Sequence, residues 1–366
     1  MNNTIITNWM TNNSYSLDNL SKNKERLEVL LNNEHYDLIH SYIIRTENDA
    51  GDYDYSSLSN IGMLYLYLHK VGTNRVDNTK KEYAREIMQF FNKIHSNGVS
   101  DIRLLKRSQV EGYRSWLIQE YTKTTTQAKK ITIVSSFLSW CYEEKYLRRD
   151  LRRALVNVKV EREQIPEREI DHSSFQAAIK YYEHDPKFKG LILLISSTGL
   201  RLNEVITPDW KDLYFDSVRS KYYLRTITKR GHERHAHIKE YVLKEIIEYR
   251  RRLGLNVSID PTDESPFYPN RTGKRYLLTS LSAIVTKKLA KAQVVTIQNN
   301  KVTAHYFRHF FARTAFNSGA PTDRISKTLG HSSSKITEEN YLHRELKKEH
   351  DVSDFVDLNE ILQSKP

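Results

Sequence analysis

The sequence contains a single cysteine, Cys141, among its 366 residues. One thiol cannot form a disulfide within the chain, and it excludes zinc sites built from several cysteines. Long apolar runs are also missing. The longest strongly apolar stretch covers only residues 191–195, whereas a helix needs about 20 residues to cross a bilayer. The N-terminus has neither the basic start nor the apolar stretch of a secretory signal. We therefore expect an intracellular protein in a reducing compartment, without a membrane segment.

The positive charge of the chain is concentrated in its later segments. The net charge is +12 and the isoelectric point about 9.4, which favours an anionic partner. Residues 1–75 nevertheless carry 6 Lys and Arg against 9 Asp and Glu, whereas residues 101–160 carry 13 against 6 and residues 161–366 carry 34 against 27. A surface for phosphates is therefore expected in the later segments. Charge alone leaves nucleic-acid binding and an ordinary soluble basic protein equally open.

The length predicts two or three domains, and the patterns along the chain place their boundaries. The first residues are helical around an acidic, tyrosine-rich loop, and we predict that this appendage contacts a partner protein or another protomer. Alternating charges with a proline mark a linker. The segments are 1–75 for the N-terminal helical appendage, 76–160 for a second helical unit, 161–172 for the linker, 173–350 for a larger domain and 351–366 for a tail helix.

Most of the larger domain has helical periodicity. Residues 212–238 alternate instead between apolar and polar positions around a turn at 229–231, which predicts a short antiparallel sheet. The expected fold class is therefore mainly α with a small antiparallel β-sheet. On this hairpin His235 and His237 would share one face, and with His232 they raise the question of a metal site. No carboxylate or cysteine accompanies them, so we predict no metal and place these histidines beside DNA or solvent.

A helix predicted over residues 125–146 combines an apolar stripe with basic flanks. The stripe repeats at three- and four-residue steps, the spacing of one helix face, at Ile131, Val134, Phe137, Leu138, Cys141 and Tyr142. The flanking cations are Lys123, Lys129, Lys130, Arg148, Arg149, Arg152 and Arg153. A helix packed by one face, with cations at its ends, suits DNA phosphates. An ordinary helical bundle with a solvated basic face has the same pattern, so both interpretations stay open.

Five basic residues and one tyrosine stand out in the larger domain. They are Arg201 in TGLRLNE, Lys229 in TKRGHER, His305 and Arg308 in HYFRH, His331 in LGHSS, and Tyr341 in EENYLHR. Each motif alone is weak, since Tyr341 is one of 23 tyrosines. In this order and with these gaps, the motifs resemble those of the tyrosine recombinase (phage integrase) family. The resemblance covers about residues 76–350 and includes the helix that ends in SWCYEEKYLRRD.

The resemblance implies a helical core-binding domain that binds DNA at 76–160, an α/β catalytic domain at 173–350, and an enzyme that cleaves and rejoins DNA. Tyr341 would form a 3′-phosphotyrosyl bond, which conserves the energy for religation. Neither ATP nor another cofactor is then needed, in keeping with the missing GxxxxGK[ST] motif. The implied partners are double-stranded DNA, a homotetramer on that DNA, and accessory proteins. The tail helix would dock on a neighbouring protomer or fold back on its own domain.

The side chains suit these roles for physical reasons. Arg201 and Arg308 offer planar forks of donors to phosphate oxygens and stay charged. Glu204 would hold the guanidinium of Arg201 from one turn away, unless it is an ordinary surface acid. A free tyrosine has a pKa of about 10 and must be activated. By resemblance, the general base is His305, the phosphate receives a hydrogen bond from His331, and the leaving 5′ oxygen receives a proton from Lys229.

Three functions from different classes follow from these patterns. The first is a recombinase or transposase of a mobile element, in the cytoplasm and beside the nucleoid of a bacterium. The second is a type IB topoisomerase-like enzyme that relaxes DNA, and the third is a non-catalytic DNA-binding relative. The mobile-element interpretation depends on the N-terminal appendage and on the ten-residue step from His331 to Tyr341. A nine-residue step is commoner in the family.

Overall fold

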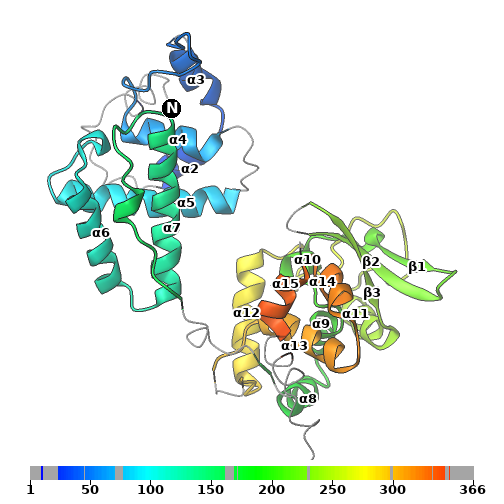
Figure 1. Ribbon diagram of the computed structural model, residues 1–366. Helices are drawn as coiled ribbons and strands as arrows, with labels where there is room; N and C mark the ends of the chain where they lie inside the picture. The colour runs from blue at the N-terminus through cyan, green and yellow to red at the C-terminus, as the bar shows by residue number, and fades with distance from the viewer. Residues whose placement is uncertain are drawn as a thin grey trace, which may run out of the picture. The chain divides into compact units, whose positions relative to one another are not determined.

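The computed structural model describes Met10 and residues 24–44, 46–70, 77–160, 169–170, 172–228, 231–296, 300–331, 333–342 and 346. The chain divides into two units, Met1–Pro166 and Glu167–Pro366, called unit 1 and unit 2 below (Figure 1). Helices dominate both units, and the described strands form one three-stranded antiparallel sheet. The predicted fold class is therefore confirmed. No described helix is both long and apolar enough to cross a membrane.

Unit 1 is built around a helix that is buried on all sides. Every residue of α4 from Asn60 to Leu68 is buried, because the sequence NIGMLYLYLH is apolar or aromatic on nearly every face. The ring of Tyr67 lies 5.3 Å from Phe137 and 5.4 Å from Trp140 between ring centroids. The elements of unit 1 are α2 (Lys24–Leu31), α3 (Tyr36–Ile44), α4 (Asn60–His69), α5 (Asp77–Ser96), the 3-10 turn η2 (Ile102–Leu104), α6 (Arg107–Glu120), α7 (Thr124–Glu143) and the 3-10 turn η3 (Arg152–Ala154).

Helix α4 falls within residues 1–75, the segment predicted to be an appendage. It packs against α5 and α7, and its side chains belong to the same hydrophobic core as theirs. Residues on both sides of the predicted boundary at residue 75 therefore share one hydrophobic core. A contact of residues 1–75 with another protein stays a prediction. Residues 161–168 of the predicted linker and the whole predicted tail helix at 351–366 lie outside the described residues.

The apolar stripe predicted for residues 125–146 forms the inner face of α7. Ile131, Val134, Phe137, Leu138 and Cys141 are all buried, whereas 39% of Tyr142 is exposed. Each large apolar side chain that is buried in this way stabilises the fold by about 1.5–3 kcal/mol. The stripe thus holds the last long helix of unit 1 in place.

Unit 2 has α9 at its centre, between α11 and α13 (Figure 1). Helix α9 begins after Asp185, whose carboxylate accepts a hydrogen bond from the Phe188 N–H at 3.1 Å, and it ends at Gly199. The elements of unit 2 are α8 (His172–Tyr181), α9 (Pro186–Thr198), α10 (Leu202–Ile206), the 3-10 turn η5 (Trp210–Asp212), β1 (Leu213–Asp216), β2 (Lys221–Ile227), β3 (Glu233–Ile238), α11 (Glu240–Arg252), α12 (Leu278–Lys291), α13 (Ala304–Asn317), α14 (Thr322–Leu329), α15 (Ser334–Thr337) and the π-helical turn η6 (Glu338–Leu342).

The sheet has the strand order β1-β2-β3, and its register decides which side chains face the helices. Leu224 pairs with Leu213 on one side and with Ala236 on the other, and all three are buried. Because side chains alternate along a strand, the neighbouring residues His235 and His237 share the outer face, as predicted. Arg234 lies on the inner face with Ala236.

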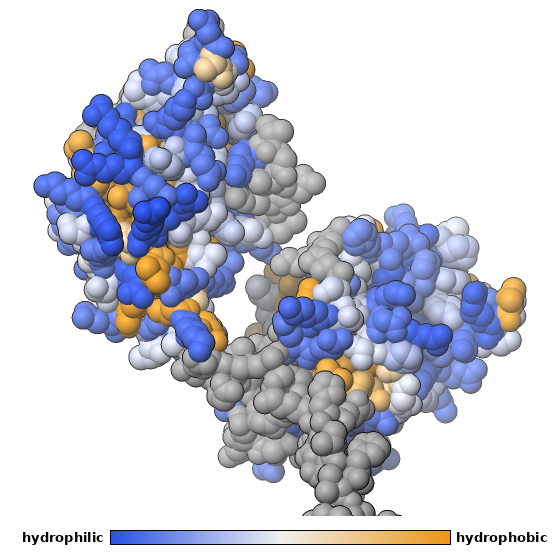
Figure 2. Space-filling model, in the orientation of Figure 1, coloured by the Kyte–Doolittle hydropathy of each residue, from blue (hydrophilic) through white to orange (hydrophobic). Residues whose placement is uncertain are grey.

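Apolar residues are mostly inside both units, as the hydrophobic effect requires. Figure 2 shows hydrophilic residues over most of the visible face of each unit, with apolar groups between them. The most exposed large apolar side chains are Val218, Leu277 and Leu104.

One fully buried arginine ties the loop after α11 to the core of unit 2. The guanidinium carbon of Arg250 lies 4.0 Å from the ring centroid of Trp210. The same guanidinium donates hydrogen bonds to the carbonyls of Asn256 at 2.9 Å and Pro266 at 2.6 Å, and to the Ser265 hydroxyl at 2.7 Å.

We predict that Arg250→Met lowers the free energy of unfolding of unit 2 by about 1–3 kcal/mol, because the partly buried acceptors lose the hydrogen bonds of the guanidinium. The exposed Arg252, which pairs with Glu248 on the same helix, provides the matched control. Arg252→Met should change the free energy by less than about 0.5 kcal/mol. Hydrogen-exchange mass spectrometry of α9 and α11 in increasing urea measures both values. Equal effects of the two substitutions would contradict the prediction.

Candidate active site

The turn between α9 and α10 places Arg201 at the start of α10. Gly199 ends α9 in the left-handed region, with a φ of +64°, which reverses the chain direction at little cost only for glycine. Glu204 accepts hydrogen bonds from the backbone N–H of Arg201 at 3.1 Å and from its Nη1 at 2.8 Å. The Glu204 side chain is 1% exposed and that of Arg201 32%. The carboxylate thus fixes the arginine while part of its guanidinium stays accessible.

Arg308 of α13 joins this turn to the end of α14. Its Nη1 donates to the Gly199 carbonyl at 2.6 Å, and its Nη2 donates to the Leu329 carbonyl. The same Nη2 lies 3.3 Å from Nε2 of His331, and the Nε–H has no acceptor among the described residues. Burial lowers the pKa of Arg308, and repulsion from Arg201 lowers it further, whereas a hydrogen bond with Tyr341 acts in the opposite direction.

His331 lies directly after Gly330, which ends α14. An arginine can only donate hydrogen bonds, so Nε2 of His331 accepts from Arg308. Nδ1 of the same ring lies 2.8 Å from the Thr337 hydroxyl. To donate a hydrogen bond to a phosphate instead, His331 would need a proton on Nε2.

Tyr341 lies in the π-helical turn η6, with its ring between two histidines. The ring centroids of His309 and His331 lie 4.2 Å and 5.2 Å from that of Tyr341, both nearly stacked, and the ring of His305 lies at 6.4 Å. His305 is exposed in the first turn of α13. Such π-turns are rare and are frequent at functional sites.

The structure thus brings together five of the six residues predicted to be catalytic: Arg201, His305, Arg308, His331 and Tyr341. Lys229 lies outside the described residues. Glu204 contacts Arg201 directly, and its role in a reaction stays a prediction. Among the described residues, no group of three or more His, Cys, Asp and Glu side chains could hold a metal ion.

Two residues of the site were not predicted to be functional. Arg234 reaches Glu204 from the inner face of β3, and His309 stacks on Tyr341. The strand alternation that put His235 and His237 on the outer face also puts Arg234 on the apolar face, where a charged residue needs a partner. That signal was present in the sequence. His309 follows Arg308 directly, but nothing in the local pattern indicates that its ring contacts a tyrosine 32 positions later.

The cluster of Arg201, Arg234, Arg308 and Glu204 has positive charge in excess. Burial lowers the pKa of Arg234 to about 10, Glu204 opposes this shift, and repulsion from Arg308 and Arg201 adds to it. One carboxylate cannot neutralise three guanidiniums. The remaining charge suits an anion with several oxygen acceptors, such as a phosphate.

The cations predicted to bind DNA in unit 1 fall into two groups. Lys129 pairs with Glu82, Arg152 pairs with Asp150, and Lys130 is buried between Glu86 and Gln89. The exposed cations without an ion pair to a described residue are Lys123, Arg148, Arg149 and Arg153.

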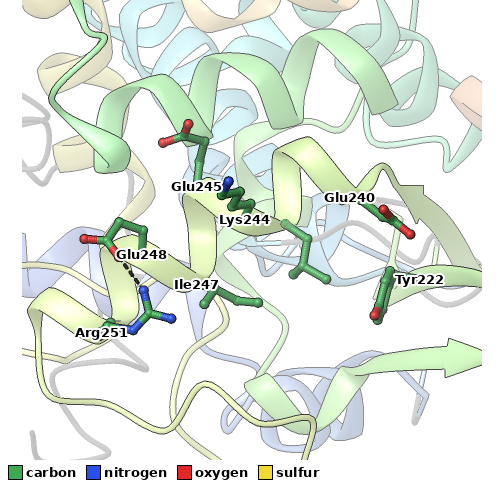
Figure 3. Close-up of a pocket in the computed structure, with 8 residues that line it drawn as sticks. Tyr222, Glu240, Lys244, Glu245, Ile247, Glu248 and Arg251 are labelled. Carbon is green, nitrogen blue, oxygen red and sulfur yellow. Dashed lines mark hydrogen bonds and ion pairs between the residues drawn. The ribbon is translucent and has the colours of Figure 1, made fainter.

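A groove of about 620 Å³ along α11 contains none of the predicted residues (Figure 3). Its acidic side chains are largely paired within the protein, since Glu245 binds Lys189 and Glu248 binds Arg251. Proteins bind the DNA backbone through contacts to its anionic phosphates, and the glutamates that line this groove would repel them. The arginine and tyrosine cluster is therefore the better candidate for an anionic partner.

The comparisons with known proteins identify the family of the chain. The model of the Phage integrase family matches residues 168–348, and that of the phage integrase N-terminal SAM-like domain matches residues 64–145. The second match begins within α4, which places this helix with the rest of unit 1. Both matches assign the chain to enzymes that cleave and religate DNA in site-specific recombination. The chain belongs to the tyrosine recombinase (phage integrase) family.

Relatives match over most of their own length. Tyrosine recombinase XerC of Thermodesulfovibrio yellowstonii is 27% identical over 283 residues, which cover 74% of this chain and 86% of the relative. Tyrosine recombinase XerD of Staphylococcus epidermidis is 22% identical over 276 residues, which cover 75% and 90%.

Solved structures share the fold. A lambda integrase (75–356) dimer bound to a COC′ core site has a TM-score of 0.58 at 15% identity, covering 76% of this chain and 93% of that chain. The Tn1549 transposon integrase in complex with circular intermediate DNA has a TM-score of 0.57 at 15% identity, covering 78% and 98%. At such identities the likeness shows the fold alone.

Gly199→Ala tests how tightly the turn before Arg201 is built. A Cβ at Gly199 would lie 2.6 Å from Cδ1 of Phe311 and 3.0 Å from Cδ2 of Leu329, so packing strain of about 1–3 kcal/mol adds to left-handed backbone strain of about 1–2 kcal/mol. Gly254→Ala has the same kind of backbone strain, with a φ of +70° and nothing within 4 Å of its Cβ. Hydrogen exchange in α10 should therefore rise more in Gly199→Ala. Equal exchange in both variants would refute this packing.

Proposed function

We propose that this protein is the site-specific recombinase of a mobile element and that Tyr341 is its nucleophile. The observation that supports this most is the convergence of one tyrosine with two arginines and two histidines from distant stretches of unit 2. The positive charge of that cluster matches a scissile phosphate. The transition state of phosphoryl transfer carries still more charge on its oxygens, so the same donors would stabilise it preferentially.

In the proposed reaction, the Tyr341 hydroxyl oxygen forms a bond to phosphorus, and the bond from phosphorus to the 5′ oxygen breaks. His305 takes the phenol proton, and Lys229 donates a proton to the departing 5′ oxygen. Arg201 and Arg308 bind the non-bridging phosphate oxygens. The product is a 3′-phosphotyrosyl bond and a free 5′ hydroxyl. Because one phosphoester replaces another, a 5′ hydroxyl can reverse the step without ATP or another cofactor.

His331 contributes according to its protonation. In the structure its Nε2 accepts from Arg308 at 3.3 Å, so a phosphate that draws the Arg308 guanidinium toward itself would release this nitrogen. A protonated His331 could then donate to the same phosphate. His309 would hold the Tyr341 ring in its orientation through the stacking contact, with 4.2 Å between ring centroids.

We propose double-stranded DNA as the partner, with the exposed cations of unit 1 on its phosphates. The segment from Arg148 to Arg153 is the strongest candidate, because Arg148, Arg149 and Arg153 are exposed and have no ion pair with a described residue. Assembly as a homotetramer on DNA is supported by the likeness to a lambda integrase tetramer bound to a Holliday junction, with a TM-score of 0.56. Docking of the tail at 351–366 on a neighbouring protomer belongs to the same proposal.

The mobile-element role is supported by the likeness to the Tn1549 transposon integrase and by the ten-residue step between His331 and Tyr341. The identity to XerC and XerD recombinases supports a recombinase, whether of a mobile element or of the Xer type.

A cellular experiment tests the mobile-element role. Sequencing of DNA junctions formed when the protein is expressed should reveal joints at the ends of an element.

A nicked suicide duplex tests the nucleophile. The duplex is first selected by the protein from a random-sequence library, and a nick beside the scissile phosphate lets the short strand diffuse away. The wild-type protein should become covalently attached to the DNA, and Tyr341→Phe should lose this adduct completely because it has no nucleophilic oxygen. Tyr306→Phe, a tyrosine on α13 outside the cluster, is the control and should retain the adduct. An adduct in Tyr341→Phe would reject the proposal.

The same substrate distinguishes recombination from type IB topoisomerase-like relaxation. A recombinase should join strands from two different duplexes. An enzyme that only relaxes DNA would form the adduct and religate it, without products that join two duplexes. Absence of any adduct in the wild type would favour a non-catalytic DNA-binding relative.

The salt dependence of DNA binding tests the basic segment. Each phosphate contact that is lost should flatten the plot of log K against log salt concentration by about 0.9. Replacing Arg148, Arg149 or Arg153 singly by Gln should reduce the steepness of this plot by up to about 0.9. Lys129→Gln should leave it nearly unchanged, because Lys129 is already paired with Glu82. A slope that depends on Lys129 and not on the arginines would reverse this assignment.

A further inference from the structure

Arg234 is a charged residue on the apolar face of a strand. Its side chain is 11% exposed, and it lies two residues before the buried Ala236, on the same face of β3. Its Nη1 lies 3.3 Å from Oε2 of Glu204, and its Nη2 donates to the Thr198 carbonyl at 2.5 Å. Burial of a charged guanidinium is costly unless it is paired and hydrogen-bonded. One partner that offsets this cost, Thr198, begins the turn that carries Arg201, and the other, Glu204, lies on α10 three residues after Arg201.

Glu204 is shared between two arginines. Its Oε1 accepts from Nη1 of Arg201 at 2.8 Å, and its Oε2 accepts from the Arg201 backbone N–H at 3.1 Å and faces Arg234. A carboxylate can rotate about its last bond. With Oε2 held by both the Arg201 N–H and Arg234, the direction of Oε1 is fixed, and so is the guanidinium bound to it.

The backbone of the same turn is held in a similar way. The adjacent carbonyls of Thr198 and Gly199 accept hydrogen bonds from Arg234 and Arg308 respectively. Two guanidiniums from β3 and α13 therefore clamp consecutive peptide groups. The clamp lies two and three residues before Arg201 in the chain.

We propose that Arg234 is a positioning residue for DNA strand cleavage, which acts by fixing Glu204 and the turn at residues 198–201 so that Arg201 points at the scissile phosphate. This inference rests on the proposed function of Arg201. Arg234 itself stays behind the carboxylate and does not touch the DNA. Arg234 could instead act on the proposed general acid Lys229, because Lys229 lies between β2 and β3 in the sequence. The experiment separates these two explanations.

The first measurement is the single-turnover rate of adduct formation on the suicide duplex at saturating DNA. Arg234→Gln should lower this rate about 10–100-fold, the usual effect of losing a residue that orients a catalytic group. DNA affinity should change less than about twofold, since Arg234 makes no phosphate contact. Arg234→Lys should stay impaired, because one ammonium cannot replace a fork that spans Glu204 and the Thr198 carbonyl. Arg225→Gln is the matched control on β2, since Arg225 faces outward and pairs with Asp212; its rate should equal that of the wild type.

A double-mutant cycle separates positioning from a general loss of structure. If Arg234 acts through Arg201, Arg234→Gln should cause less than a twofold further loss in an Arg201→Ala background. A general destabilisation of unit 2 would lower the rate by the same factor in both backgrounds, and that result would overturn the inference.

A substrate with sulfur in place of the bridging 5′ oxygen tests the route through Lys229. A thiolate is a good leaving group because thiols are much more acidic than alcohols, so this substrate needs no general acid. The defect of Arg234→Gln should persist on it, and rescue to the wild-type rate would overturn the inference. A wild-type protein that forms no adduct on either substrate would instead reject the proposed function. A normal rate for Arg234→Gln beside an active wild type would reject only the positioning role.

Discussion

The geometry of the arginine cluster in unit 2 depends on the buried carboxylate of Glu204, which binds Arg201 and Arg234. This carboxylate lies among three guanidiniums from α10, β3 and α13, and only one of these, Arg201, has a substantial exposed part. Removing ions from water is costly, and three like charges near one carboxylate add repulsion. The fold tolerates this arrangement because each guanidinium also binds backbone carbonyls or the carboxylate. An anion at the open side would relieve the remaining repulsion among the guanidiniums.

The sequence predicted much of this arrangement. The order of the arginine, histidine and tyrosine motifs indicated the family, and periodicity located α7 and the sheet. Strand alternation correctly placed His235 and His237 on the outer face. These features succeed because each depends on residues that are close in sequence, where the spacing determines which face a side chain occupies.

Other features depend on tertiary contacts and could not be predicted in the same way. The apolar sequence of α4 indicates burial on nearly every face, but it does not indicate which helices surround it. Lys130 looks like a phosphate ligand beside Lys129, yet Glu86 of another helix neutralises it. The stacking of His309 on Tyr341 requires α13 and η6 to meet, and no local pattern encodes that meeting. Arg234 is an intermediate case, because alternation indicates its face but not its partner.

The most direct test of the account is to identify the residue that becomes linked to DNA. Nuclease trimming of the covalent adduct, followed by protease digestion and mass spectrometry, locates the attached nucleotide on a peptide. The account predicts a nucleotide phosphate on the peptide that contains Tyr341. A nucleotide on a peptide with any other tyrosine, or on a serine, would contradict it.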